Sequence, residues 1–178
     1  MRITGGFLKG RQVKVPDGTI RPAMDKMRES VFAILGDLSG LSFLDLFTGS
    51  GIIALEAASR GAEYIEAVEM DPLKRKTLLG NVQISPKRIN CRFMSAELYV
   101  KRAKRAFDLI FCDPPFPYQF KWELINEISS SSLVKENTLV LLHRPREDFN
   151  KEAFSALIRA DYREYGHSVV EFLKYTKN

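Results

Sequence analysis

The chain has 178 residues, of which 45% are hydrophobic and 28% are charged, and this composition is typical of a soluble globular protein. The length fits a single domain over residues 1–178, and no apolar run reaches the roughly 18 residues that a membrane span requires. The N-terminus lacks the apolar stretch of a secretory signal. The two cysteines and two histidines are not at metal-ligand spacing, so we expect no metal site. The cysteines show no disulfide framework, which indicates a reducing, cytoplasmic location. Because no apolar run is long enough to span a membrane, we expect no membrane partner.

The net charge of +5 is confined to the N-terminal segment. Residues 1–28 hold seven basic and two acidic side chains, whereas the remaining 150 residues hold 20 of each. A basic arm on a neutral body suggests a polyanionic partner, and a solubilising terminus is the alternative reading of the same charge. The residues expected to contact nucleic acid are Lys9, Arg11, Arg21, Lys26 and Arg28.

The N-terminal segment contains turn signals followed by one helical pattern. The first fifteen residues, with glycines at positions 5, 6 and 10, are predicted to form a β-hairpin, and Pro16-Asp17-Gly18 a turn. Pro22 can open a helix whose apolar residues recur at three- and four-residue spacing as far as Leu35, and Gly36 suits its C-terminal end. Residues 1–38 are therefore expected to form a hairpin-and-helix extension.

From residue 39 to residue 178, short apolar strands alternate with helical patterns. Strands are predicted at Leu41–Phe47, Tyr64–Val68, Ile89–Met94, Phe107–Cys112 and Thr138–His143. Helices are predicted at Ile52–Ser59, Pro72–Val82, Ala96–Lys104, Trp122–Ile128 and Phe149–Ile158. Tyr162–Tyr165 and Val169–Tyr175 are expected to form a closing pair of strands. The alternation indicates the α/β class, with a doubly wound, mostly parallel seven-stranded sheet covered on both faces.

In sheets of this kind ligands bind beyond the carboxyl ends of the strands, and the first strand ends in a glycine turn. The segment runs from Asp45 to Gly51 in the order Asp-Leu-Phe-Thr-Gly-Ser-Gly, with Ala54 three residues further on. Gly49 and Gly51 allow the backbone to turn sharply and to approach a ligand at the start of the next helix. The pattern also matches the dinucleotide fingerprint, and a tight turn without a ligand uses similar residues. It favours a nucleotide-type cofactor without identifying it.

Glu69 follows the second strand, eighteen residues after Gly51. A carboxylate at this place can accept hydrogen bonds from both hydroxyls of a ribose. The competing role, an acid at the N-terminus of the next helix, is filled better by Asp71. Together the turn and the acid favour a cofactor with an adenosine ribose, but they do not distinguish a dinucleotide from S-adenosylmethionine.

The fourth strand ends in Asp113-Pro114-Pro115-Phe116. Neither proline has an N–H group, so the loop presents two acceptors, the Asp113 carboxylate and the Pro114 carbonyl, next to an aromatic ring. This arrangement suits an exocyclic amine on a nucleobase, which donates two hydrogens and can stack on Phe116. Two acceptors can pyramidalise the nitrogen and direct its lone pair toward an electrophilic methyl group. The loop therefore points to amine methylation.

These strand ends resemble the class I Rossmann-like methyltransferases, and Asp113–Phe116 resembles the amino-methyltransferase signature within that class. A wider match, from Ile3–Gly6 through Arg28-Glu29 to Glu69–Asp71, resembles the bacterial RsmD family, which methylates the N2 amine of a guanine in small-subunit ribosomal RNA. The resemblance covers nearly the whole chain. It implies S-adenosylmethionine as cofactor, S-adenosylhomocysteine as product, and ribosomal RNA or a small-subunit assembly particle as partner.

The resemblance also implies roles for individual residues. The residues that it places at the cofactor are Asp45, Phe47, Thr48, Gly49, Ser50, Gly51, Glu69, Met70, Ser95, Ala96 and Asp113. Among them, Glu69 would bind the ribose and Met70 would pack beside the adenine. The residues that would hold the target base are Asp113, Pro114, Pro115 and Phe116. Two positions depart from the family pattern, Ala54 in place of glycine and the C-terminal Tyr165–Ser168 segment.

Four alternatives stay open from the sequence. A nicotinamide dehydrogenase fits the glycines and Glu69 but not the loop that begins at Asp113. A non-enzymatic RNA-binding module explains the basic arm alone. An amino-methyltransferase could act instead on adenine N6 or cytosine N4, in DNA or in another RNA. Finally, the arm could be a structural part of the fold that covers one edge of the sheet, with no contact to RNA.

Overall fold

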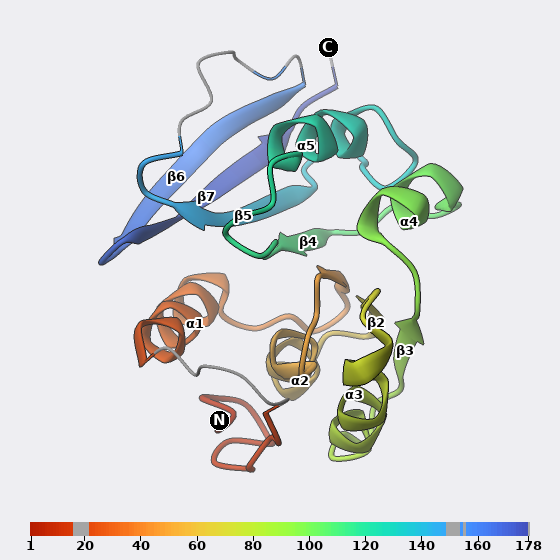
Figure 1. Ribbon diagram of the computed structural model, residues 1–178, viewed down its shortest axis with the longest axis vertical. Helices are drawn as coiled ribbons and strands as arrows, with labels where there is room; N and C mark the ends of the chain where they lie inside the picture. Colours follow the sequence, from red (N-terminus) through yellow and green to blue (C-terminus); the bar gives the residue numbers. More distant parts are fainter. Residues whose placement is uncertain (16–21, 149–153, 155, 178) are drawn as a thin grey trace.

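Seven strands form one sheet in the computed structural model, which describes residues 1–15, 22–148, 154 and 156–177 (Figure 1). The strands are β1 (Ser42–Leu46), β2 (Tyr64–Val68), β3 (Ile89–Arg92), β4 (Leu109–Cys112), β5 (Leu139–Pro145), β6 (Leu157–Tyr165) and β7 (Ser168–Tyr175). Their order across the sheet is β3-β2-β1-β4-β5-β7-β6. The first five in this order are parallel, and β7 is antiparallel to both of its neighbours. The expected mostly parallel sheet and its closing pair are confirmed.

Helices cover both faces of the sheet. They are α1 (Pro22–Leu35), α2 (Ile52–Ser59), the short 3₁₀ helix η1 (Pro72–Lys74), α3 (Arg75–Val82), α4 (Ala96–Arg102) and α5 (Lys121–Ser129). Figure 1 shows α1, α2 and α3 on one side of the strands and α4 and α5 on the other. Successive strand residues alternate between the two apolar layers, so that Phe43 packs with α1 and α2 whereas Leu44 packs with α4 and α5. No helix of the described residues is long and apolar enough to cross a membrane.

Two of the predicted helices differ from the structure. The single helix expected over Pro72–Val82 is divided into η1 and α3, because Asp71 caps a tight first turn by accepting the Leu73 N–H at 2.9 Å. The helix expected over Phe149–Ile158 is wrong at its end, because Leu157 and Ile158 already pair with β7. Its other residues, apart from Phe154 and Ala156, and the turn expected at Pro16–Gly18 lie outside the described residues.

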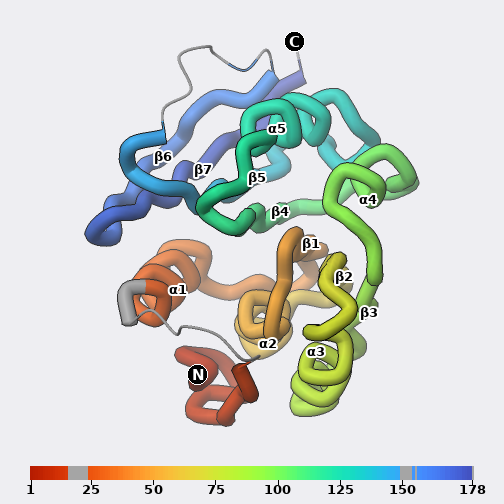
Figure 2. Tube along the Cα trace, in the orientation of Figure 1, coloured from red at the N-terminus to blue at the C-terminus, as the bar shows by residue number. Residues whose placement is uncertain are grey.

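The N-terminal arm, residues 1–15, packs against α2 (Figure 2). Ile3, Leu8 and Val13 are buried in the same apolar cluster as α1 and α2. The predicted hairpin is reduced to one isolated bridge between Arg2 and Gln12. Gly6 has φ +73°, and a Cβ atom there would lie 1.9 Å from the Ser59 carbonyl oxygen, so only glycine permits this approach to α2. The arm is thus an anchored part of the fold.

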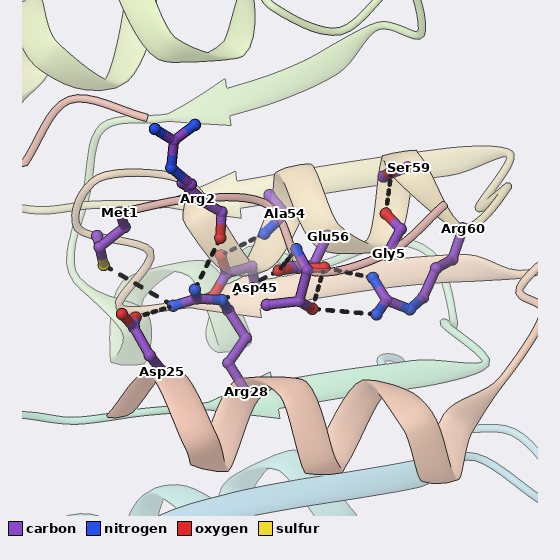
Figure 3. Close-up of polar contacts among 11 residues, drawn as sticks. Met1, Arg2, Gly5, Asp25, Arg28, Asp45, Ala54, Glu56, Ser59 and Arg60 are labelled. Atoms are coloured by element: carbon purple, nitrogen blue, oxygen red, sulfur yellow. Dashed lines mark hydrogen bonds and ion pairs between the residues drawn. The ribbon is translucent and has the colours of Figure 1, made fainter. Parts of the chain in front are cut away.

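A buried carboxylate, Glu56 of α2, joins the arm to α1 (Figure 3). Its Oε1 accepts hydrogen bonds from the Thr4 N–H at 2.7 Å and from the Arg28 Nε–H at 3.0 Å. Its Oε2 accepts a hydrogen bond from the Arg60 guanidinium. The Arg28 guanidinium also donates to Asp25 and to the Arg2 carbonyl, each at 2.9 Å. Arg28 is 3% exposed, so it serves this network in place of the RNA contact expected from its charge.

Glu56→Gln should lower the free energy of unfolding by about 3–5 kcal/mol, because it leaves the guanidinium groups of Arg28 and Arg60 without their buried counter-charge. Gln keeps the shape of the side chain, so the loss reports on charge and not on packing. Urea unfolding measures the change, and Glu63→Gln, at an exposed position, is the matched control. Equal stability of the two variants would contradict the role given to Glu56.

Candidate functional site at the carboxyl ends of the strands

The parallel strands bring three predicted segments to one edge of the sheet. Leu46, the last residue of β1, is level with Val68 of β2 on one side and with Cys112 of β4 on the other. The residues that follow these strands are the glycine turn, Glu69 and Asp113. The sequence prediction that these segments converge at the strand ends agrees with this register.

The glycine turn between β1 and α2 is held in an unusual backbone conformation. Gly49 and Gly51 have φ of 57° and 84°, and Phe47 has φ of 64°, which is rare for a residue with a side chain. A Cβ atom on Gly51 would lie 2.8 Å from Cδ1 of Leu78, so α3 packs directly against the turn. Asn81 of α3 supports it as well, because its side-chain amide donates to the Ser50 carbonyl at 2.8 Å. Such strain is typical of ligand-binding turns.

Asp45 is buried beneath this turn and has one unsatisfied oxygen. Its Oδ2 accepts the Thr48 hydroxyl and the Ala54 N–H, the latter at 3.1 Å. Its Oδ1 has no hydrogen-bond partner among the residues that the structure describes. Burial raises the pKa of Asp45 to about 8, and the negative charges of Asp113 and Glu69 add to the shift against the opposing hydrogen bonds from Thr48 and Ala54. A cationic donor from a ligand would satisfy Oδ1 and stabilise the ionised form.

Glu69 connects the second strand end to the turn. Its Oε2 accepts the Gly49 N–H and its Oε1 accepts the Asp71 N–H, both at 2.8 Å, and Nζ of Lys74 lies 3.7 Å from Oε2. These contacts fix the plane of the carboxylate, although each oxygen has a second lone pair for another donor. The Glu69 side chain is 5% exposed, so a hydroxyl that binds there would be shielded from water.

The other expected cofactor residues differ in what they expose. Met70, next to Glu69 in the chain, is 65% exposed, so its apolar side chain is accessible to an apolar ligand group. Ser95 caps α4 by accepting the Leu98 N–H at 3.2 Å. Ala96 is buried in the apolar layer with α4 and α5, so its methyl group serves packing and only its backbone is left for a ligand.

The residues of the loop after β4 differ in exposure. The Asp113 side chain is 17% exposed, Pro114 is buried, and Pro115 is exposed. Phe116 is half-buried beside them. Further along the loop, the Tyr118 ring meets the Phe47 ring edge-on at 5.3 Å between centroids, so the loop contacts the glycine turn.

Sequence reasoning missed His143, which lies within β5 and is followed there by Arg144 and Pro145. Its Nδ1 lies 2.7 Å from Oδ1 of Asp113, and its side chain is 2% exposed. The signal was present, because the sequence places His143 last in a predicted strand, at a point where ligands bind. What the sequence does not show is that β4 and β5, which are separated by α5, pair directly in the sheet.

The residues expected to contact RNA, other than the buried Arg28, belong to the N-terminal part of the chain. Lys9, Arg11 and Lys26 are exposed on the arm and α1, and Arg21 lies outside the described residues. A groove of about 600 Å³ between the arm and α1 is lined in part by Lys26, and neither Glu69 nor Asp113 borders it. This groove is therefore not part of the strand-end site.

A family model, related sequences and solved structures all relate this chain to the same group of proteins. A family model described as "Conserved hypothetical protein 95" matches residues 1–174. "Putative rRNA methyltransferase YlbH" of Bacillus subtilis is 31% identical over 98% of both chains. "Ribosomal RNA small subunit methyltransferase D" of Escherichia coli is 31% identical over 83% of this chain and 76% of that protein. The solved structure "Putative methyltransferase yhhF from Escherichia coli" superposes with a TM-score of 0.88 at 24% identity, covering 100% of this chain and 99% of that one.

The sheet order, the glycine turn and the acidic strand ends define a Rossmann-like methyltransferase. The chain belongs to the family described as "Conserved hypothetical protein 95", and the resemblance to the RsmD family is confirmed.

Asp45→Asn should remove a pH dependence from the stability of the ligand-free protein. Because the folded-state pKa of Asp45 is about 8 and its ordinary value is 3.8, the folded state holds the proton more tightly across this window. The free energy of unfolding should therefore fall as the pH rises through the window, by up to about 1.4 kcal/mol per pH unit from this group. Urea unfolding of wild type and variant at several pH values tests this, and parallel curves would contradict it.

Proposed function

We propose that the protein transfers a methyl group from S-adenosylmethionine to the exocyclic N2 amine of a guanine in small-subunit ribosomal RNA. The observation that carries the proposal is the Asp113–Phe116 loop, which contains a carboxylate and an aromatic ring and continues to Tyr118, in contact with Phe47 of the glycine turn. The names of the Bacillus subtilis and Escherichia coli relatives support ribosomal RNA as substrate. Guanine N2 is the finer part of the proposal and rests on the RsmD resemblance.

The residues at the glycine turn fit the proposed cofactor. The unpaired Oδ1 of Asp45 suits the ammonium group of its methionine part, and the Glu69 carboxylate suits its ribose hydroxyls. Met70 offers an exposed apolar side chain for the adenine. Bound S-adenosylmethionine supplies an electrophilic methyl group. The chain's own task is to bring the nucleophile to it in the correct orientation.

An exocyclic amine is a poor nucleophile because its lone pair is delocalised into the aromatic ring. The Asp113 carboxylate and the Pro114 carbonyl can each accept one of its two N–H groups, which pyramidalises the nitrogen and localises the lone pair. Phe116 can stack on a base that has left its helix. Catalysis on this view is positioning and electrostatic stabilisation, and the carboxylate accepts the proton that the methylated amine releases.

For RNA capture we propose the exposed part of the arm and α1, with Lys9, Arg11 and Lys26 as phosphate contacts and Arg21 as a further candidate. Naked ribosomal RNA and a small-subunit assembly particle both present the phosphates that such a surface needs. Residues 1–38 then have two roles, since Arg28 and the apolar residues of the arm stabilise the fold.

Asp113→Ala should lower kcat about 10²- to 10³-fold, because it removes an acceptor aimed at the amine in the transition state. S-adenosylmethionine affinity, measured by calorimetry, should change much less. Methyl transfer to small-subunit RNA and nucleoside mass spectrometry give the rate and the product, and a melting curve checks the fold. Asp161→Ala, on β6, is the matched control.

A rate near that of wild type in Asp113→Ala would overturn the chemistry assigned to the loop. N6-methyladenine or N4-methylcytosine in place of N2-methylguanine would keep the chemistry and favour the alternative substrates.

Exchanging Lys9 and Arg11 together for alanine should weaken RNA binding and reduce its salt dependence. Each phosphate contact that is lost should lower the slope of log K against log salt by about 0.7 to 0.9. Both side chains are exposed, so the melting temperature and cofactor affinity should stay unchanged. The matched control replaces Lys174 and Lys177, which are exposed at the C-terminus of the chain. An unaltered slope would leave the arm with a structural role alone.

A further inference from the structure

His143 lies directly beside the Asp113 carboxylate because β4 and β5 are paired in parallel. Cys112 is level with Leu142, so the next residue of each strand, Asp113 and His143, emerges at the same edge. Nδ1 of His143 is 2.7 Å from Oδ1 of Asp113. The imidazole is 2% exposed, and its other nitrogen, Nε2, is buried with no hydrogen-bond partner in the described part of the chain.

These contacts determine which nitrogen carries the proton. A buried N–H without an acceptor is costlier than a buried lone pair without a donor. A proton on Nε2 would be such an orphan, whereas a proton on Nδ1 meets a carboxylate oxygen at good hydrogen-bond distance. The favoured arrangement therefore has Nδ1–H donating to Asp113, and Asp113 is held as an acceptor.

The same imidazole supports the aromatic part of the loop. The Phe116 ring meets the His143 ring edge-on, with 5.5 Å between centroids and 63° between planes. One side chain from β5 thus contacts both parts of the loop that hold the target base, the acceptor and the stacking ring. The hydrogen bond from His143 engages Oδ1 of Asp113 and leaves Oδ2 for the substrate.

We propose that His143 is a positioning residue for methyl transfer: its Nδ1–H fixes the Asp113 carboxylate so that Oδ2 faces the target amine, and its ring fixes Phe116. The proposal rests on the function proposed above, since it takes Asp113 as the acceptor of the amine. A histidine that only fills space between β4 and the loop would affect stability, whereas a positioning histidine sets the rate of the bound complex.

Two substitutions separate these roles. In His143→Asn the side-chain amide nitrogen occupies the place of Nδ1 and can still donate to Asp113. In His143→Gln the amide reaches the place of Nε2 and leaves Oδ1 without its donor, although Gln retains more of the volume. We expect His143→Asn to keep kcat within a few-fold of wild type and His143→Gln to lower it by about 10- to 100-fold. KM for RNA and the Kd of S-adenosylmethionine should be nearly unchanged in both.

The reverse order, with Gln more active than Asn, or equal rates in the two variants, would overturn the positioning role. If Asp113→Ala is inactive while His143→Gln turns over like wild type, this inference fails and the proposed function stands. If Asp113→Ala is active, the proposed function fails first. A measurement on the unaltered protein is independent of how the variants fold: nitrogen NMR of ¹⁵N-histidine should show His143 protonated at Nδ1, and an Nε2–H tautomer would overturn the proposal.

Discussion

The parallel register of β1 with β2 and β4 is the constraint on which the site depends. The strands end level with one another. As a result, strand pairing alone brings together the turn after Leu46, the acid after Val68 and the loop after Cys112. The packing of α3 then fixes the turn, because Leu78 and Asn81 contact it directly. The chemistry of the site follows from sheet geometry, and the loops supply only the functional groups.

The convergence also explains the electrostatics. Asp45, Glu69 and Asp113 are three acidic groups at one sheet edge, and the proximity of the other two is part of the reason that the pKa of Asp45 is raised. Folding places these acidic groups close together: the residues of the turn offer them N–H and hydroxyl donors, and the ammonium group of Lys74, 3.7 Å from Glu69, is partly exposed. Such an edge is organised for a positively charged ligand, in agreement with the proposed sulfonium cofactor.

Most of the fold was predictable because its signals are local. The alternation of apolar strands and helices, Pro22 and Gly36 at the ends of α1, and the glycines of the turn each act within a few residues. The roles of Arg28 and His143 were not predictable in this way. Charge indicated that Arg28 contacts RNA, but its partner Glu56 lies 28 residues away, inside an apolar helix. His143 meets Asp113 across 30 residues, through a strand pairing that no local pattern encodes.

The anchoring of the arm on α2 has a consequence for the order of events during synthesis. The Thr4 N–H donates to Glu56, 52 residues further along the chain, and the Leu8 N–H donates to the side chain of Ser59. Chains grow from the N-terminus at about 5–20 residues per second, so the arm emerges several seconds before its partners exist. The most basic part of the nascent chain therefore leaves the exit tunnel unpaired, beside the RNA-rich surface of the ribosome that made it. It can dock only after α2 has followed it out.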